Sequence, residues 1–267
     1  MEIHEGRQGK EPESNDDDVT RLGTSREKSG IGSIREKIEP AGSVSHVVFN
    51  EANTQLIASV KGVPPTPGIL AVWDIAADGS LSENFTTVQP STGGLLPFSM
   101  TVIPGKNAIL AADAGDGVDV FDFNNAAGAG VAAGNSSTLP IKGQGATPFS
   151  PQTGNFYVND IETAEITEIN VDHNLKPSIV AMLRCVRQQY PQGNGTATID
   201  NDIATVNQKD FMYVLAANAT EVKVLSLNAP GKATALQTLS LAPVRVAGVP
   251  ISPDNIRQLF FRPFRAR

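Results

Sequence analysis

The chain has 267 residues, a net charge of −7 at pH 7 and 40% apolar residues. This charge does not suit a nucleic-acid-binding surface, which needs clustered Lys and Arg. No apolar run approaches the roughly eighteen residues of a membrane-spanning helix. The many Gly (24) and Pro (18) residues favour short strands joined by tight turns over long helices. Composition therefore predicts an all-β protein with no nucleic-acid partner and no membrane span.

The beginning of the chain differs in composition from the rest. Residues 1–42 are dense in both charges, include a run of three aspartates and have few large apolar side chains. Such a segment cannot bury enough apolar surface to offset the entropy lost on ordering. We therefore expect a disordered charged leader over residues 1–42, a folded domain over residues 43–253 and an irregular basic and aromatic tail over residues 254–267.

An internal repeat organises the expected domain. Four apolar runs each contain a polar anchor and are followed by a turn rich in Asp, Asn and Gly. The anchors are Asp74, Asp122, Asn170 and Ser226. They are separated by 48, 48 and 56 residues, and each run alternates apolar and polar residues as a half-buried strand does. The spacing indicates a tandem structural unit.

Each unit has further strands on both sides of its anchor. A hairpin precedes the anchor, and a more exposed strand follows it. The hairpin turns are predicted at residues 50–55, 104–107, 150–155 and 207–210. Four strands in about fifty residues are typical of a β-propeller blade, and because one blade cannot cover its own apolar faces, blades must stack. We predict an all-β fold, a β-propeller of four-stranded blades with about four to five blades present; a β-sandwich is the alternative. The Gly- and Ala-rich residues 124–137 are expected to form a flexible loop between blades.

The pair Trp73-Asp74 raises the possibility of a WD-repeat propeller, which would act as an intracellular docking scaffold. WD repeats are nearer forty residues long and carry a Gly-His pair before Trp-Asp. Here no Gly-His pair occurs, and the other three anchors lack the Trp-Asp dipeptide. The sequence therefore argues against this class.

The fifty-residue unit and the "DGSL" turn after the Trp-Asp pair instead resemble the lactonase-type (6-phosphogluconolactonase-like) seven-bladed propellers. Within that group, Gly94–Asp113, Phe149–Ile161 and Gly195–Val206 are most similar to the fungal 3-carboxymuconate cyclase-like proteins. The resemblance implies an incomplete seven-bladed propeller, since the folded part holds about four and a half such units. It also implies an extracellular or cell-wall glycoprotein that cyclises or hydrolyses a lactone.

Polar residues on inner strands and at strand ends are the candidate site, because inner strands line a propeller's channel and ligands meet the loops at one mouth. The ligand-channel candidates are Ser99, Thr147, Asp113, Asp160 and Asp200. His46 and Asp202 are the candidate catalytic residues, since an imidazole and a carboxylate can act as general acid and base. The alternative is that His46 is a satisfied structural residue and that the aspartates cap turns.

Four Asn-X-Ser/Thr sequons agree with an extracellular glycoprotein. Their asparagines are Asn84, Asn135, Asn194 and Asn218. Met1 is not followed by the apolar core of a signal peptide, and the single Cys185 cannot form an intramolecular disulfide.

The sequence requires no cofactor. Three scattered histidines give no metal-site spacing, while the lactonase-type resemblance leaves a divalent cation such as Ca²⁺ open. The expected partner is a small lactone or another extracellular ligand. A non-catalytic propeller that binds a glycan, the cell wall or a host protein is the alternative function.

Overall fold

A computed structural model describes most of the chain between Val44 and Pro243. The described residues are 44–63, 65–90, 94–124, 131–132, 135–141, 145–160, 164–182, 186–187, 189–191 and 198–243. The expected leader (1–42) and tail (254–267) lie outside them. In this described part, no helix is long and apolar enough to cross a membrane.

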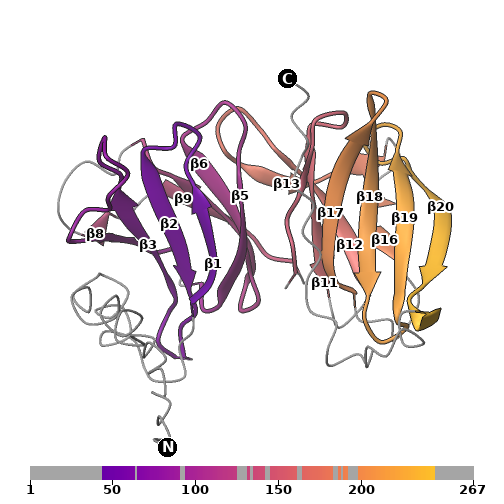
Figure 1. The fold of residues 1–267 in the computed structure, drawn as a ribbon, viewed down its shortest axis with the longest axis horizontal. Helices are drawn as coiled ribbons and strands as arrows, with labels where there is room; N and C mark the ends of the chain where they lie inside the picture. Colours follow the sequence, from indigo (N-terminus) through magenta and orange to yellow (C-terminus); the bar gives the residue numbers. More distant parts are fainter. Residues whose placement is uncertain are drawn as a thin grey trace, which may run out of the picture.

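Four sheets follow one another along the chain, each built on four antiparallel strands (Figure 1). We number them blades 1 to 4. Blade 1 consists of β1 (Val44–Phe49), β2 (Gln55–Val60), β3 (Ile69–Asp74) and β4 (Thr86–Val88), and blade 2 of β5 (Pro97–Val102), β6 (Ala108–Asp113), β7 (Gly117–Asp122) and β9 (Asn135–Leu139). Blade 3 consists of β10 (Phe149–Ser150), β11 (Asn155–Asp160), β12 (Glu165–Val171) and β13 (Pro177–Ile179), and blade 4 of β17 (Thr198–Val206), β18 (Lys209–Ala216), β19 (Glu221–Leu227) and β20 (Ala233–Ser240).

The predicted repeat matches these blades strand by strand. All four anchors lie on third strands: β3, β7, β12 and β19. The first three predicted hairpin turns join the first and second strands of their blades. The fourth is shorter than predicted, because Asn207 and Gln208 both take positive φ (51° and 62°) in a two-residue turn of the kind that suits a tight hairpin. β18 therefore already begins at Lys209.

Residues 124–137 do not form only a loop, as the sequence had suggested. Val131–Ala132 form β8, which pairs in parallel with β4 of blade 1. Asn135 begins β9, the outermost strand of blade 2. Backbone hydrogen bonds can hold an outer strand without large apolar side chains, so a composition rich in Gly, Ala and Ser hid these two strands.

The longer interval between the last two anchors also contains strands. Its short hairpin is formed by β14 (Ala181–Met182) and β15 (Val186–Arg187). β16 (Gln189–Pro191) then pairs with β12 at the edge of blade 3. The extra residues therefore add to the rim of one blade and leave the order of the blades unchanged.

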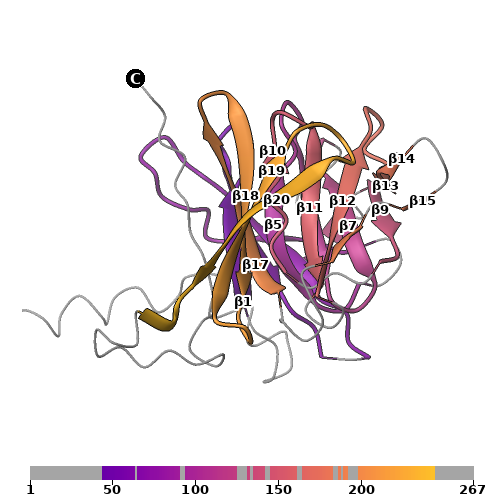
Figure 2. The same ribbon diagram turned by 90° about the vertical axis from the view of Figure 1, so that its right-hand side faces the viewer.

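Buried apolar side chains fill the space between consecutive blades, which we call seam 1–2, seam 2–3 and seam 3–4. Seam 1–2 contains Ile57, Leu70, Val72, Val88, Met100, Ile109, Ala111, Phe121 and Phe123. Seam 2–3 includes Leu110, Val118, Val120, Phe156, Val158 and Ile169, and seam 3–4 includes Tyr157, Ile166, Met212, Val214 and Leu225. Figure 2 views the stack from the side of blade 4. Stacking of blades therefore provides the core.

Replacing a side chain within a seam should cost far more stability than the same replacement on an outward face. Phe121 is 0% exposed in seam 1–2, whereas Phe49 is 53% exposed on blade 1. We expect Phe121→Ala to lower the free energy of unfolding by about 3–5 kcal/mol, through lost burial and a residual cavity. Phe49→Ala, the matched control, should cost about 1 kcal/mol or less. Urea denaturation measures both, and equal losses would contradict the stacked core.

Candidate functional site

The two ends of the blades differ in their loops. At the turn end, the β1–β2 and β5–β6 turns meet, where Asn50 Nδ2 donates to Asn107 Oδ1 at 3.3 Å. At the connection end, the β6–β7 loop meets the segment that joins blade 1 to blade 2, because Asp113 at the end of β6 is paired with Pro97 at the start of β5. β6 runs from the turn end of blade 2 to its connection end, so the two ends are one strand length apart.

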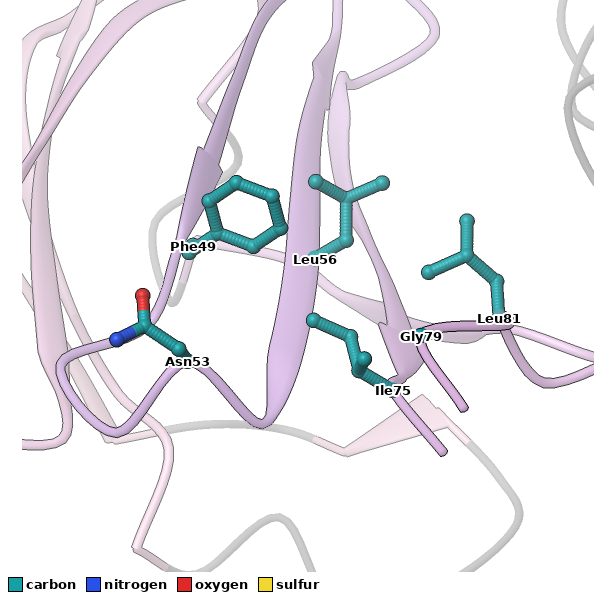
Figure 3. Close-up of a pocket in the computed structure, with 6 residues that line it drawn as sticks. All are labelled: Phe49, Asn53, Leu56, Ile75, Gly79 and Leu81. Atoms are coloured by element: carbon teal, nitrogen blue, oxygen red, sulfur yellow. The ribbon is translucent and has the colours of Figure 1, made fainter. Parts of the chain in front are cut away.

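A pocket of about 390 Å³ opens at the turn end of blade 1 (Figure 3). It is lined by Phe49, Asn53, Leu56, Ile75, Gly79 and Leu81. None of these six side chains is titratable, and Asn53 alone among them carries a polar side chain. The pocket can take an apolar group, but its lining offers no acid, base or charged metal ligand.

Three carboxylates gather at the connection end. Asp113, Asp116 and Asp119 each place one oxygen within 4.8 Å of the others. Asp113 ends β6, Asp116 lies in the β6–β7 loop and Asp119 lies on β7. Strand alternation places Asp113 and Asp119 on the face of blade 2 that carries Ile109 and Phe121, so they belong to seam 1–2. We call these three residues the carboxylate cluster.

Asp113 is held by backbone N–H groups on both sides. Leu96 N donates to Oδ1 and Oδ2 at 2.8 and 3.0 Å, and Gly115 N donates to Oδ1 at 2.7 Å. These bonds tie the β6–β7 loop to the connection between the blades. They are the bonds of a capping residue, which was the structural alternative for Asp113.

Asp119 has a different environment. Its Oδ1 accepts a hydrogen bond from Thr138 Oγ1 at 2.6 Å, whereas Oδ2 is buried and has no hydrogen-bond partner among the described residues. Burial raises the pKa of the Asp119 carboxyl to about 7; the hydrogen bond from Thr138 opposes this shift, and the charges of Asp116 and Asp113 add to it. This group therefore titrates near neutral pH. The sequence analysis did not select Asp116 or Asp119, and the three-residue spacing of the aspartates was the available signal.

His46 lies on β1 and faces seam 1–2. Its Nδ1 accepts a hydrogen bond from Met100 N at 3.0 Å, and its own backbone N donates to Ser59 Oγ at 3.1 Å. Nδ1 is therefore the unprotonated nitrogen, and Nε2 carries the proton. Burial lowers the pKa of this imidazole, which keeps it neutral at pH 7. Met100 is paired with Ala111, and Ala111 with Asp119, so His46 and Asp119 face the same seam, with β6 between the strand that His46 contacts and the strand of Asp119.

Ser99 and Thr147 lie where the inner strands of blades 2 and 3 meet: Ser99 is on β5, and Thr147 comes just before β10. Thr147 Oγ1 lies 2.9 Å from Thr101 Oγ1 and 3.5 Å from Ser99 Oγ, and either oxygen of each pair can donate. Thr147 is buried. These ligand-channel candidates thus link blade 2 to blade 3 through their side chains.

The remaining aspartate candidates lie at the end of β11 on blade 3 and on β17 of blade 4. The backbone oxygen of Asp160, whose side chain is buried, accepts from Thr198 Oγ1 at 3.1 Å. Asp200 and Asp202 each accept a hydrogen bond from the N–H of the next residue, at 3.0 and 2.7 Å. Asp202 is on β17 and His46 on β1, so blades 2 and 3 lie between the two predicted catalytic residues along the stack.

Two of the four sequon asparagines have exposed side chains. Asn84 lies just before β4, and Asn218 lies in the β18–β19 turn. Asn135 is the first residue of β9, and Asn194 lies outside the described residues.

Three of the solved structures with a similar fold are named as gluconolactonases or 6-phosphogluconolactonases. Periplasmic gluconolactonase PpgL from Pseudomonas aeruginosa is similar with a TM-score of 0.57 and 15% identity, over 74% of this chain and 58% of that chain. Candidate 6-phosphogluconolactonases from Bacteroides uniformis and Bacteroides fragilis both give TM-scores of 0.55, at 17% and 14% identity, over 73% of this chain and 56% of theirs.

These similarities show the fold, because the identities are low. The chain has a β-propeller fold of the lactonase type, with four blades in the described part, and it spans just over half the length of the three solved chains. No family model and no curated protein matches the sequence.

The burial of His46 should make stability depend on pH. The pKa of His46 is lower in the folded than in the unfolded protein, so the unfolded chain binds the proton more readily as the pH falls. The contribution of His46 is complete above pH 6.5 and is lost as the pH falls below that value. In His46→Asn, Oδ1 of the new side chain can still accept from Met100 N, but the titratable imidazole is gone. When the pH is lowered from about 8 to about 5, we therefore expect the free energy of unfolding to fall less in this variant than in the unmodified protein. Urea midpoints at both pH values measure this difference, and parallel losses would contradict it.

Proposed function

We propose that this propeller acts on a lactone at the connection end of seam 1–2. It hydrolyses the lactone or, as the 3-carboxymuconate cyclase-like resemblance implies, forms one by adding a carboxylate oxygen to one carbon of a C=C bond while a proton adds to the other carbon. The observation that supports this location is that a neutral imidazole and two carboxylates, those of Asp113 and Asp119, face one seam, with the carboxylate of Asp116 in the adjoining loop. Perturbed titratable groups that gather at a loop end are typical of functional sites. The lactonase-type fold supports the substrate class by likeness alone.

Lactone hydrolysis needs a positioned water and a hydrogen-bond donor for the carbonyl oxygen. A water held at the carboxylate cluster attacks the carbonyl carbon of the lactone, the ring C–O bond breaks, and the freed ring oxygen takes up a proton as the acid product forms. Negative charge develops on the carbonyl oxygen during the attack. The Nε2–H of neutral His46 is the donor for that oxygen, because a preorganised hydrogen bond stabilises such charge strongly in a site shielded from water.

The bond between His46 Nδ1 and Met100 N gives this role a physical basis. It fixes the tautomer, so the proton stays on Nε2, and it orients the ring against β5. Asp202 is on another blade and enters the proposal only as a separate candidate for testing. Ser99 and Thr147 act as structural links between blades in this scheme.

Lactone turnover by the full chain is the direct test. δ-Gluconolactone and 6-phosphogluconolactone are followed by acid release at constant pH, and ring closure of 3-carboxymuconate is followed by loss of its diene absorbance. We expect His46→Asn to lower kcat about 10²–10³-fold with little change in KM, since the lost hydrogen bond acts mainly in the transition state. The exposed Glu83 of blade 1 provides the control Glu83→Gln, which should keep full activity.

Two results would overturn parts of this proposal. If no substrate of the three is turned over above the uncatalysed rate, the lactone proposal fails. If turnover is unchanged in His46→Asn but lost in Asp202→Ala, the reaction belongs to blade 4 and not to seam 1–2.

The extracellular glycoprotein is likewise a proposal, supported by the exposure of two sequons. When the chain is secreted from a yeast host, we expect an endoglycosidase to reduce its mass. The shift should become smaller in Asn84→Gln and in Asn218→Gln, and smaller still in the double variant, because both side chains are exposed. A mass that the enzyme does not change would contradict glycosylation.

A further inference from the structure

The carboxylate cluster poses an electrostatic problem. Asp113 and Asp119 are 0% exposed and Asp116 is half-buried, yet their oxygens lie within 4.8 Å of one another. Like charges at this distance repel, and burial removes the water that would otherwise screen them. In the folded protein, a bound proton or a bound cation must therefore offset the repulsion among the three carboxylates.

An oxygen in the cluster also has no partner. Within the described residues, Oδ2 of Asp119 is buried and accepts no hydrogen bond, although Oδ1 of the same group accepts one from Thr138. Leaving a buried acceptor unsatisfied costs about 1–3 kcal/mol, and more when it is charged. Asp113 needs no such compensation at its backbone contacts, because Leu96 and Gly115 both donate to it. Oδ2 of Asp119 is therefore the oxygen of the cluster that can take up a proton or bind a cation.

A glycine packs tightly against this oxygen. A Cβ built on Gly94 would lie 2.5 Å from Pro90 Cγ, 2.8 Å from Asp113 Oδ2 and 2.9 Å from Asp119 Oδ2. These contacts are closer than real Cβ atoms make, so the two oxygens converge on the same face of Gly94. Any side chain at this position would clash with Pro90 and with the cluster. The connection between blades 1 and 2 therefore brings Oδ2 of Asp113 and Oδ2 of Asp119 together against one backbone position.

We propose that Asp113, Asp116 and Asp119 bind one divalent cation that prefers oxygen ligands, such as Ca²⁺, with Asp119 Oδ2 among its ligands. Carboxylate oxygens are the ligands that hard cations select. Three protein oxygens leave further coordination positions for water. Binding of the cation stands without any enzymatic activity; its use in holding the attacking water rests on the proposed lactone function.

Calorimetry on the full chain, first treated with a chelator and then titrated with Ca²⁺, tests the site. We expect one ion per chain, and a higher melting temperature with Ca²⁺ than in chelator, because the ion binds the folded state. Asp119→Asn preserves shape but removes a charge and should weaken binding at least about tenfold. Asp116→Asn, at a less buried position, should also weaken binding, whereas Glu83→Gln should not change it.

The outcomes separate the possibilities. No Ca²⁺ binding by the unmodified protein, together with an Asp119→Asn variant that is equally or more stable, would overturn the proposal and assign a shared proton to the carboxylates. Binding that is unchanged in both Asp116→Asn and Asp119→Asn would overturn it by placing the ion elsewhere. Binding at the cluster without lactone turnover would leave this proposal intact and remove only the proposed function.

Discussion

Face-to-face packing of neighbouring sheets is the constraint on which the rest of this structure depends. Each inner blade covers both of its faces with its neighbours, so even its middle strands are buried on both sides. The outward faces of blade 1 and blade 4 include exposed apolar side chains: Phe49 on one and Val206 on the other are about half exposed, although Ala71 and Trp73 on the outward face of blade 1 are buried. A polar side chain on a middle strand must therefore find its partners inside a seam and not in water.

This constraint explains which parts of the fold the sequence could predict. Stacking imposes the same four strands on every unit, so anchors 48 residues apart were enough to predict the blades and their third strands. The outermost strands are held mainly by backbone bonds and are exposed, as β20 is, so their side chains carry little signal. For this reason the strands within residues 124–137 were missed. The turn at Asn207 was predicted too long for another reason, because positive φ at Asn207 and Gln208 closes the hairpin in two residues.

The same constraint explains what was missed at the candidate site. In "GVDVFD", residues 117–122, Asp119 occupies the polar position of an alternating strand, which would face water in a two-layer protein. Here that position faces seam 1–2 and is fully buried. Asp113 and His46 could be selected because strand ends and inner strands are readable from the repeat. That His46 shares a seam with the aspartates, and Asp202 does not, depends on the order of the blades in space.

Rigid packing also explains why the carboxylates remain together. Ile109 and Phe121 lie on the same strands and the same face as Asp113 and Asp119, and both are fully buried in seam 1–2. β6 and β7 therefore cannot move apart to relieve the repulsion without opening the apolar core, which would cost several kcal/mol. The apolar turn-end pocket has no comparable conflict, because its lining carries no charge. At the connection end of seam 1–2, the apolar packing holds the three carboxylates together against their repulsion. A cation bound there would reduce this repulsion without any rearrangement of the blades.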